Sequence, residues 1–123
     1  MNWMDEFLNI VQKNATDPLI INSTPEELNT EFKNIPYFFN PEKKTRAYKQ
    51  ALKDNTAACA EAAAAIAASL SVRKIPFEVC YKYDDLTNGA HVVIIANGRI
   101  FDPYKNYFPS GVSCVHKSEF LPL

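Results

Sequence analysis

The first third of the chain places its hydrophobic residues at helical spacing. The pattern begins near the N-terminus and predicts an amphipathic helix over residues 2–13. Its apolar positions are Trp3, Met4, Phe7, Leu8 and Val11. Asp17-Pro18 interrupts the pattern, and Leu19-Ile20-Ile21 reads as a short extended piece.

Two cap-plus-proline signals predict the next helices. Thr24-Pro25-Glu26-Glu27 combines a capping residue, a proline for the first turn and a glutamate that completes a capping box, so a helix should run to about Asn34. Asn40-Pro41-Glu42 repeats the signal and predicts a helix over about 41–53. The basic side chains of that second helix should form a solvated face, with an anionic partner as the alternative. They are Lys43, Lys44, Arg46 and Lys49.

Between these helices, Ile35-Pro36 breaks the helical pattern and Tyr37-Phe38-Phe39 follows as an aromatic loop or short strand. We expect these aromatic side chains to join the core. The alternative is that they line a substrate groove.

An alanine-rich segment gives the strongest helix prediction. Nine alanines fall between Ala57 and Ala68, after the cap cluster Asp54-Asn55-Thr56. Alanine has the highest helix propensity, and its small side chain lets neighbouring elements approach closely. We therefore expect a central helix over 57–71, packed against a sheet.

After Ile75-Pro76, the period of the pattern changes from helical to alternating. Residues 77–83 alternate as in a half-buried strand, 90–96 are almost all apolar as in a strand buried on both faces, and 99–104 follow the hairpin signal Asn97-Gly98. Residues 112–117 predict an edge strand. Helices followed by antiparallel strands define an α+β fold, in which N-terminal helices and the central alanine-rich helix pack on a small antiparallel sheet.

Composition narrows the class of protein. With 123 residues, 47% hydrophobic and 22% charged, the chain suits one globular domain over residues 1–123, large enough to bury a core. The net charge of −1 and the scattered Lys and Arg residues argue against nucleic-acid or membrane partners. Frequent Asn and the excess of Lys over Arg suggest an AT-rich genome, such as that of a phage or a low-GC bacterium.

Cysteine usage and the N-terminus bear on localisation. Three widely spaced cysteines fit a reducing compartment, or at most one bridge. Residues 1–6 lack the features of a signal peptide, and the alanine-rich segment is too weakly hydrophobic to span a membrane. We expect a cytoplasmic protein, or a virion component if the source is viral.

The candidate chemistry lies in Cys59, His91 and Asp102. A two-residue Asn97-Gly98 turn places Val93 opposite Asp102 and His91 opposite Tyr104. His91 and Asp102 then share a face as diagonal cross-strand neighbours, within reach of a hydrogen bond. A three-residue loop would separate them, because it changes the parity.

Cys59 lies where the central helix should begin. The positive end of the helix dipole and a neighbouring imidazolium both favour a thiolate, which is the nucleophilic form of cysteine. Amides of the first turn can hold an oxyanion, with Asn55 and Tyr104 as auxiliary candidates. Each residue also has a bland interpretation: Cys59 as a small core residue, His91 as a half-buried histidine and Asp102 as a turn residue.

Metal binding is the weaker chemical hypothesis. Cys114-Val115-His116 has no second ligand pair at zinc-site spacing, so we predict that Cys80 and Cys114 are structural and that His116 is a surface residue. A zinc site of Cys59, Cys80, His91 and Cys114 is a third possibility, and we predict neither metal nor cofactor.

The ordered set of motifs resembles the transglutaminase-like core of the papain-like cysteine enzymes. The matching pieces are Cys59-Ala60-Glu61, Ile75-Pro76, Gly89-Ala90-His91 and Asn97-Gly98-Arg99-Ile100-Phe101-Asp102-Pro103. The resemblance implies a Cys59 nucleophile, a His91 base and an Asp102 that orients it. The chain departs from the family where Thr56-Ala57-Ala58, Ala60 and Val92 flank the Cys and the His, positions that bear on the oxyanion hole and substrate class.

Two functions follow from these residues. The first is cysteine-dependent acyl transfer, most simply hydrolysis of an amide or peptide bond in a protein or peptide substrate, with transglutamination as the variant. The second is a non-catalytic binding or assembly protein, possibly viral, that retains the fold.

Overall fold

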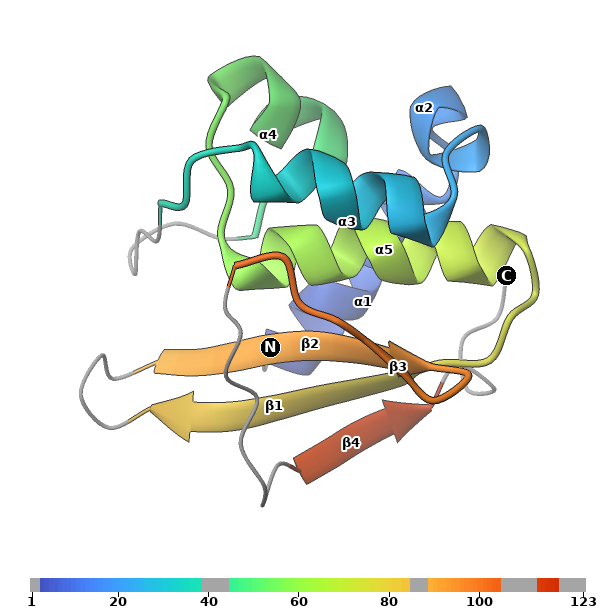
Figure 1. Ribbon diagram of the computed structural model, residues 1–123, viewed down its shortest axis with the longest axis vertical. Coiled ribbons are helices and arrows are strands. Elements are labelled where there is room, and N and C mark those ends of the chain that lie inside the picture. The colour runs from blue at the N-terminus through green and yellow to red at the C-terminus, as the bar shows by residue number, and fades with distance from the viewer. Residues whose placement is uncertain (1–2, 39–44, 85–88, 105–112, 118–123) are drawn as a thin grey trace.

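The computed structural model describes residues 3–38, 45–84, 89–104 and 113–117. Five helices precede four strands along this part of the chain, which confirms the α+β prediction (Figure 1). No helix among the described residues is both long enough and apolar enough to cross a membrane.

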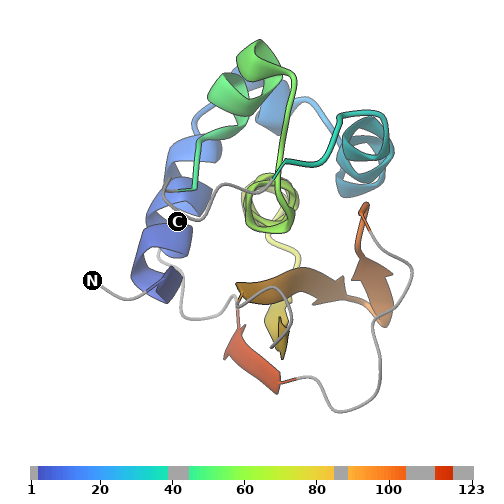
Figure 2. The ribbon, with the colours of Figure 1, turned by 90° about the vertical axis from the view of Figure 1, so that its left-hand side faces the viewer.

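The molecule has a helical layer above an antiparallel sheet, and the central helix lies between the two. This helix, α5 (Cys59–Val72), contacts α1 (Trp3–Asn14), α3 (Pro25–Lys33) and strand β2 (Gly89–Ala96). Seen end-on, α5 has helices on three sides and the sheet beneath it (Figure 2). Residues 61–71 of α5 are all buried, because a helix enclosed on every side has no solvent face. The predicted central helix is confirmed.

The N-terminal helices follow the sequence signals with one exception. Helix α1 matches its predicted span, and α3 carries the full capping box in which Thr24 and Glu27 exchange hydrogen bonds. The extended piece predicted at Leu19-Ile20-Ile21 is wrong, since Pro18–Ile21 form the short helix α2. Helix α2 forms for a local reason. The Asp17 side chain accepts a hydrogen bond from the Leu19 amide at 2.9 Å and so caps the turn that Pro18 begins.

The fourth helix is shorter than predicted. Helix α4 spans Tyr48–Asp54, and residues 45–47 before it are not helical; residues 41–44 of the predicted span lie outside the described residues. Side chains from distant parts of the chain hold this lead-in: the amides of Thr45 and Tyr48 donate to Glu6 and Asn14, each at 2.8 Å. Tertiary hydrogen bonds therefore replace the helical ones that the local sequence favours. The predicted basic face fails at Arg46, which lies outside the helix and is only 20% exposed.

The aromatic segment does not enter the core. Tyr37 and Phe38 are 52% and 54% exposed, which contradicts the predicted burial; Phe39 lies outside the described residues. Ala57 pairs with this segment: its amide donates to the carbonyl of Pro36, and its own carbonyl accepts from the amide of Phe38. This bridge holds the aromatic segment extended at the surface.

The sheet has the strand order β3-β2-β1-β4 and is antiparallel throughout. Besides β2, its strands are β1 (Glu78–Asp84), β3 (Arg99–Phe101) and β4 (Ser113–Lys117). Strands β1, β2 and β4 lie close to their predicted spans. The strand predicted over 99–104 is too long, because β3 ends at Phe101 and the pairs predicted for Asp102 and Tyr104 do not form. Val92, Ile94 and Phe101 belong to the core with α5, and Val93 is also fully buried, as expected for an inner strand.

The hairpin between β2 and β3 has the predicted two-residue turn. Asn97 and Gly98 have φ angles of 52° and 74°, the left-handed values that a type I′ turn requires. The resulting register pairs Ala96 with Arg99 and Ile95 with Ile100, as predicted. The side chains of β2 and β3 therefore alternate between the two faces of the hairpin as the sequence predicts.

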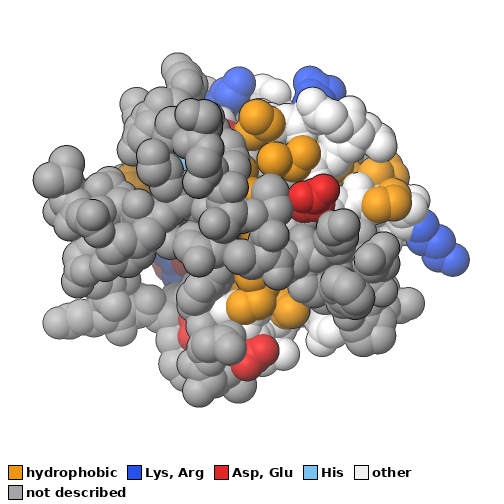
Figure 3. Space-filling view, turned by 90° about the horizontal axis from the view of Figure 1, so that it is seen from below, with side chains coloured by type: hydrophobic (Ala, Val, Ile, Leu, Met, Phe, Trp, Pro, Cys, Tyr) orange, Lys and Arg blue, Asp and Glu red, His pale blue; other side chains and the backbone are white. Residues whose placement is uncertain are grey.

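The β1–β4 side of the sheet contains a disulfide-bonded cysteine. Cys80 of β1 is disulfide-bonded, and Cys114 of β4 is its partner in the strand register. The cysteine count left open either reduced cysteines or at most one disulfide bond, and the structure contains a disulfide bond. In the view from below, hydrophobic side chains of described residues show in several separate places, and Lys and Arg side chains are visible along the upper and right-hand edges (Figure 3).

Candidate active site

Cys59 is the first residue of α5. The helix begins two residues later than predicted, because Ala57 is held extended by its bridge to the aromatic segment and Ala58 takes the capping position. The amide of Ala58 donates to Glu61 Oε1 at 2.9 Å, so the side chain at the third helical position closes the first turn. Cys59 is 6% exposed. Its thiol thus lies at the positive end of the helix dipole.

His91 and Asp102 meet across the hairpin. His91 Nε2 and Asp102 Oδ2 are 2.9 Å apart, with the two side chains 17% and 7% exposed. Pairing in β3 ends at Phe101, one residue before Asp102. The predicted hydrogen bond across the hairpin is confirmed.

Cys59 joins this pair. The pKa of His91 is raised from 6.5 to about 9, first by its hydrogen bond with Asp102 and then by its hydrogen bond with Cys59. Burial acts in the opposite direction and is outweighed. The structure therefore brings together the three residues that the sequence singled out.

Of the two auxiliary candidates, Tyr104 lies at this site. Its ring packs edge-on against Tyr37, with centroids 5.1 Å apart. Its hydroxyl is buried and has no hydrogen-bond partner among the described residues. Burial raises the pKa of Tyr104, and the charge of Glu61 raises it further, so the phenol keeps its proton. A buried, protonated and unpartnered hydroxyl near the thiol can donate to an incoming oxygen.

The other candidate, Asn55, ends the preceding helix. It is the C-cap of α4, exposed, with a left-handed φ of 54°. Its predicted part in the oxyanion site stays a prediction.

Sequence reasoning missed a buried ion pair beside Cys59. Glu61 is 4% exposed, and its carboxylate accepts from Arg46 at both oxygens: 2.7 Å from Nε to Oε2 and 2.8 Å from Nη2 to Oε1. The Arg46 amide also donates to Oε2, at 2.8 Å. Glu61 at the third position of the helix was the available signal, but nothing local indicated that its partner would be Arg46.

The chemistry of the cysteines bears on the zinc hypothesis. Cys80 is disulfide-bonded, so it has no thiolate to offer a metal. No group of three or more His, Cys, Asp and Glu side chains within the described ranges is arranged to hold a metal ion.

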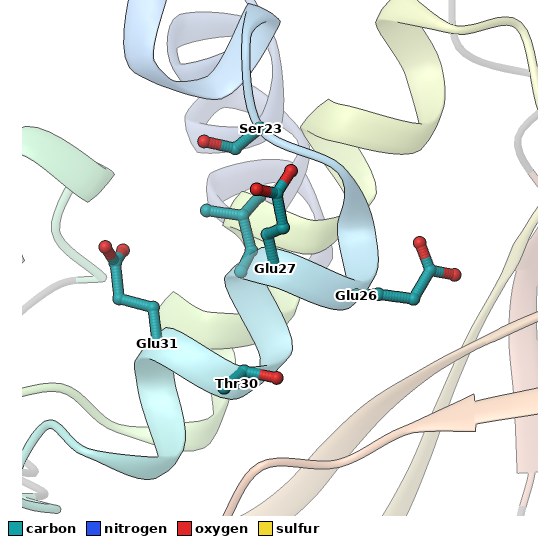
Figure 4. A pocket seen from close by; sticks show the side chains of 6 residues that line it. Ser23, Glu26, Glu27, Thr30 and Glu31 are labelled. Carbon is teal, nitrogen blue, oxygen red and sulfur yellow. The ribbon is translucent and has the colours of Figure 1, made fainter.

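A separate depression lies along α3 (Figure 4). It is lined by Ser23, Glu26, Glu27, Leu28, Thr30 and Glu31. Its three carboxylates already have partners: Glu26 contacts Arg99, Glu27 caps its own helix and Glu31 accepts from the hydroxyl of Tyr48. These contacts give the acidic side chains a structural role.

Comparisons of this chain with protein-family models, curated proteins and solved structures found no match.

Proposed function

We propose that the protein is a cysteine-dependent acyl-transfer enzyme that hydrolyses an amide or peptide bond with Cys59, His91 and Asp102. One observation carries the proposal: His91 is hydrogen-bonded to both Asp102 and Cys59. A nucleophile, a base and a group that orients the base are the components of a thiol hydrolase.

The reaction has two steps. The Cys59 sulfur attacks the carbonyl carbon, the C–N bond breaks, and the amine leaves with the proton that His91 donates. Water then attacks the resulting thioester, His91 accepts one of its protons, and the carboxylic acid leaves as the Cys59 thiolate and the His91 imidazolium form again. Asp102 holds the imidazole in one orientation and stabilises its charged form throughout.

The resting charge state suits this chemistry. A His91 pKa of about 9 keeps the imidazole protonated at neutral pH, beside a thiol at a helix N-terminus. An imidazolium and the helix dipole both favour the thiolate. The amides of the first turn and the Tyr104 hydroxyl are the donors available to the oxyanion.

The arrangement also supports a finer fold class. A cysteine at the start of a central helix, with the histidine and aspartate on an antiparallel hairpin beneath it, is the plan of the transglutaminase-like core. We infer membership of that superfamily from this order of elements together with the resemblance of the motifs. A protein or peptide is the substrate class that fits, and water is the simplest acceptor.

Alkylation with iodoacetamide at pH 6 tests the proposal. Peptide mapping by mass spectrometry follows Cys59 in the native chain, in His91→Gln and in the urea-unfolded chain. Native Cys59 should react faster than in the unfolded chain, and His91→Gln should remove the advantage. A native rate no faster than the unfolded one means that Cys59 is not an activated nucleophile.

The burial of Cys59 favours a second candidate, a non-catalytic binding or assembly module. Here Cys59 would be a core residue, and Cys59→Ala would leave the biological phenotype and any assembly unchanged. Loss of function in a folded Cys59→Ala chain excludes this candidate.

A further inference from the structure

We infer that Arg46 and Glu61 form a charge-balancing pair that sets the reactivity of Cys59, with Arg46 cancelling a carboxylate that would otherwise oppose the thiolate. This inference rests on the proposed function, because it concerns the same cysteine. Neither residue touches the reacting atoms, so both are positioning residues.

The carboxylate of Glu61 lies at the end of the helix where Cys59 is found. Its Oε1 accepts from the amide of Ala58, the residue directly before Cys59, at 2.9 Å. A buried negative charge there favours the helix, because it faces the positive end of the dipole. The same charge disfavours a second negative charge on the neighbouring sulfur.

Arg46 supplies the compensating charge through all five of its guanidinium N–H donors. Besides its bonds to Glu61, Nη1 donates to Asp54 at 2.8 Å and to Thr56 Oγ1 at 3.2 Å, and Nη2 donates to the Thr56 carbonyl at 3.0 Å. The pKa of Arg46 is raised further above its ordinary value, chiefly by Glu61, so the guanidinium is always charged. The lead-in to α4, the end of α4 and the first turn of α5 are all fixed to one cation.

Other groups around the site are consistent with this role. Cys59 contacts His91 of β2, which is itself hydrogen-bonded to Asp102. Tyr104 lies close enough that Glu61 raises the pKa of its hydroxyl and Arg46 lowers it. The thiol thus shares one electrostatic environment with two carboxylates, one imidazole and one guanidinium. Asp54 enters that environment only through its ion pair with Arg46.

Energetics argue against a purely structural explanation. Replacing a buried ion pair by apolar side chains of similar size is often neutral or stabilising, so stability alone does not require charges here. A helix start can also be capped by a neutral side chain. What the pair provides in addition is a fixed potential at the first turn of α5.

The test measures the rate of Cys59 alkylation by iodoacetamide against pH, because this neutral reagent reports the thiolate. Arg46→Met leaves Glu61 uncompensated, and labelling at pH 6 should slow roughly five- to tenfold. Glu61→Gln removes the carboxylate from the first turn of α5 and keeps the cation, which stays paired with Asp54, so labelling at pH 6 should become faster. Arg46→Lys keeps the charge and should stay near the wild-type rate, as should the double variant Arg46→Met/Glu61→Gln.

Arg73→Met is the matched control. Arg73 is also hydrogen-bonded, to Ser69 and to the Ile21 carbonyl, but at the far end of the same helix. At 1.5 Å per residue it lies about 20 Å from Cys59, so its removal should leave the labelling profile unchanged.

Opposite signs in Arg46→Met and Glu61→Gln support the inference, because a merely structural pair would slow both variants. Equal signs, or no change in either, overturn it. If Arg46→Met does not fold, Glu61→Gln decides by itself: faster labelling supports the inference, and slower or unchanged labelling overturns it. Failure of the proposed function is distinguishable, since native wild-type Cys59 would then label no faster than in the unfolded chain.

Discussion

His91 Nε2 and Asp102 Oδ2 lie 2.9 Å apart although 11 positions separate the two residues in the chain. A turn of two residues makes this possible, because it puts both side chains on the same face of one hairpin. The contact links turn chemistry to the candidate active site, and the predictions below begin from it.

Changing the length of the Asn97-Gly98 turn should first lower and then restore the reactivity of Cys59. One glycine inserted after Gly98 makes a three-residue loop, reverses the parity of β3 and carries Asp102 away from His91. Alkylation of Cys59 at pH 6 should then fall to the rate of His91→Gln. Two inserted glycines restore the parity and should recover most of the wild-type rate; equal rates for both insertions would contradict the register argument.

Asp102→Asn should lower the pKa of His91 from about 9 toward its ordinary 6.5, because the hydrogen bond with Asp102 is the largest cause of the increase. An NMR titration of the imidazole measures this, with the resonance assigned by its loss in His91→Gln. His116 serves as the reference in the same spectrum. A pKa that stays near 9 in Asp102→Asn would show that another group holds the proton.

Stability should decline with rising pH through His91. Its folded-state pKa, about 9, is above the ordinary 6.5, so the folded chain holds the proton more tightly than the unfolded chain. The stabilisation is complete below about pH 6.5 and is lost as pH rises to about 9, an effect of the order of 1–3 kcal/mol. Urea unfolding at pH 6, 7.5 and 9 without reductant measures the loss relative to His91→Gln, which should lack this component; parallel curves would refute it.

Removing the Tyr104 hydroxyl should cost no stability. That hydroxyl is buried with no hydrogen-bond partner among the described residues, so Tyr104→Phe removes an unsatisfied group and should be neutral or stabilising by up to about 1 kcal/mol. Tyr48→Phe is the matched control: it loses a hydrogen bond to Glu31 and should destabilise by about 1 kcal/mol. Thermal unfolding compares the two, and a destabilised Tyr104→Phe would indicate a structural partner. If Tyr104 donates to the oxyanion, turnover of a peptide substrate by Tyr104→Phe should also fall while folding is intact.

Truncation in the central helix should be costly. Ile66 is fully buried in α5, and Ile66→Ala should lower the free energy of unfolding by about 2–4 kcal/mol through lost burial and a cavity. Ile21→Ala makes the same chemical change at a residue that is 46% exposed, and should cost less than about 1 kcal/mol. Urea unfolding compares the two variants; similar losses would contradict the position of α5 at the centre of the core.

Local signals predicted most of the secondary structure because they act within a few residues. The Thr24–Glu27 capping box, the alanine run and the Asn97-Gly98 turn each satisfy or constrain the backbone from nearby. The turn also predicted the His91–Asp102 contact, because side chains along paired strands alternate between the two faces of the sheet.

The errors occurred where distant side chains competed with local preference. Residues 45–47 favour helix by sequence, but Glu6 and Glu61 accept the amides of Thr45 and Arg46. Ala57 favours helix as well, but its bridge to the aromatic segment delays the helix until Cys59. Exposure of Tyr37 and Phe38 followed from the same bridge, which no local pattern encodes.

The sequence by itself determined the order of elements, the hairpin register and the identity of Cys59, His91 and Asp102 as a set, because spacing and turn chemistry are local properties. Tertiary structure alone decided that α5 meets the hairpin at Cys59, that the Tyr104 hydroxyl has no hydrogen-bond partner among the described residues, and that Arg46 neutralises Glu61. These contacts join segments that are far apart in the chain. Burial by the surrounding elements excludes water and so strengthens the interactions between the charges.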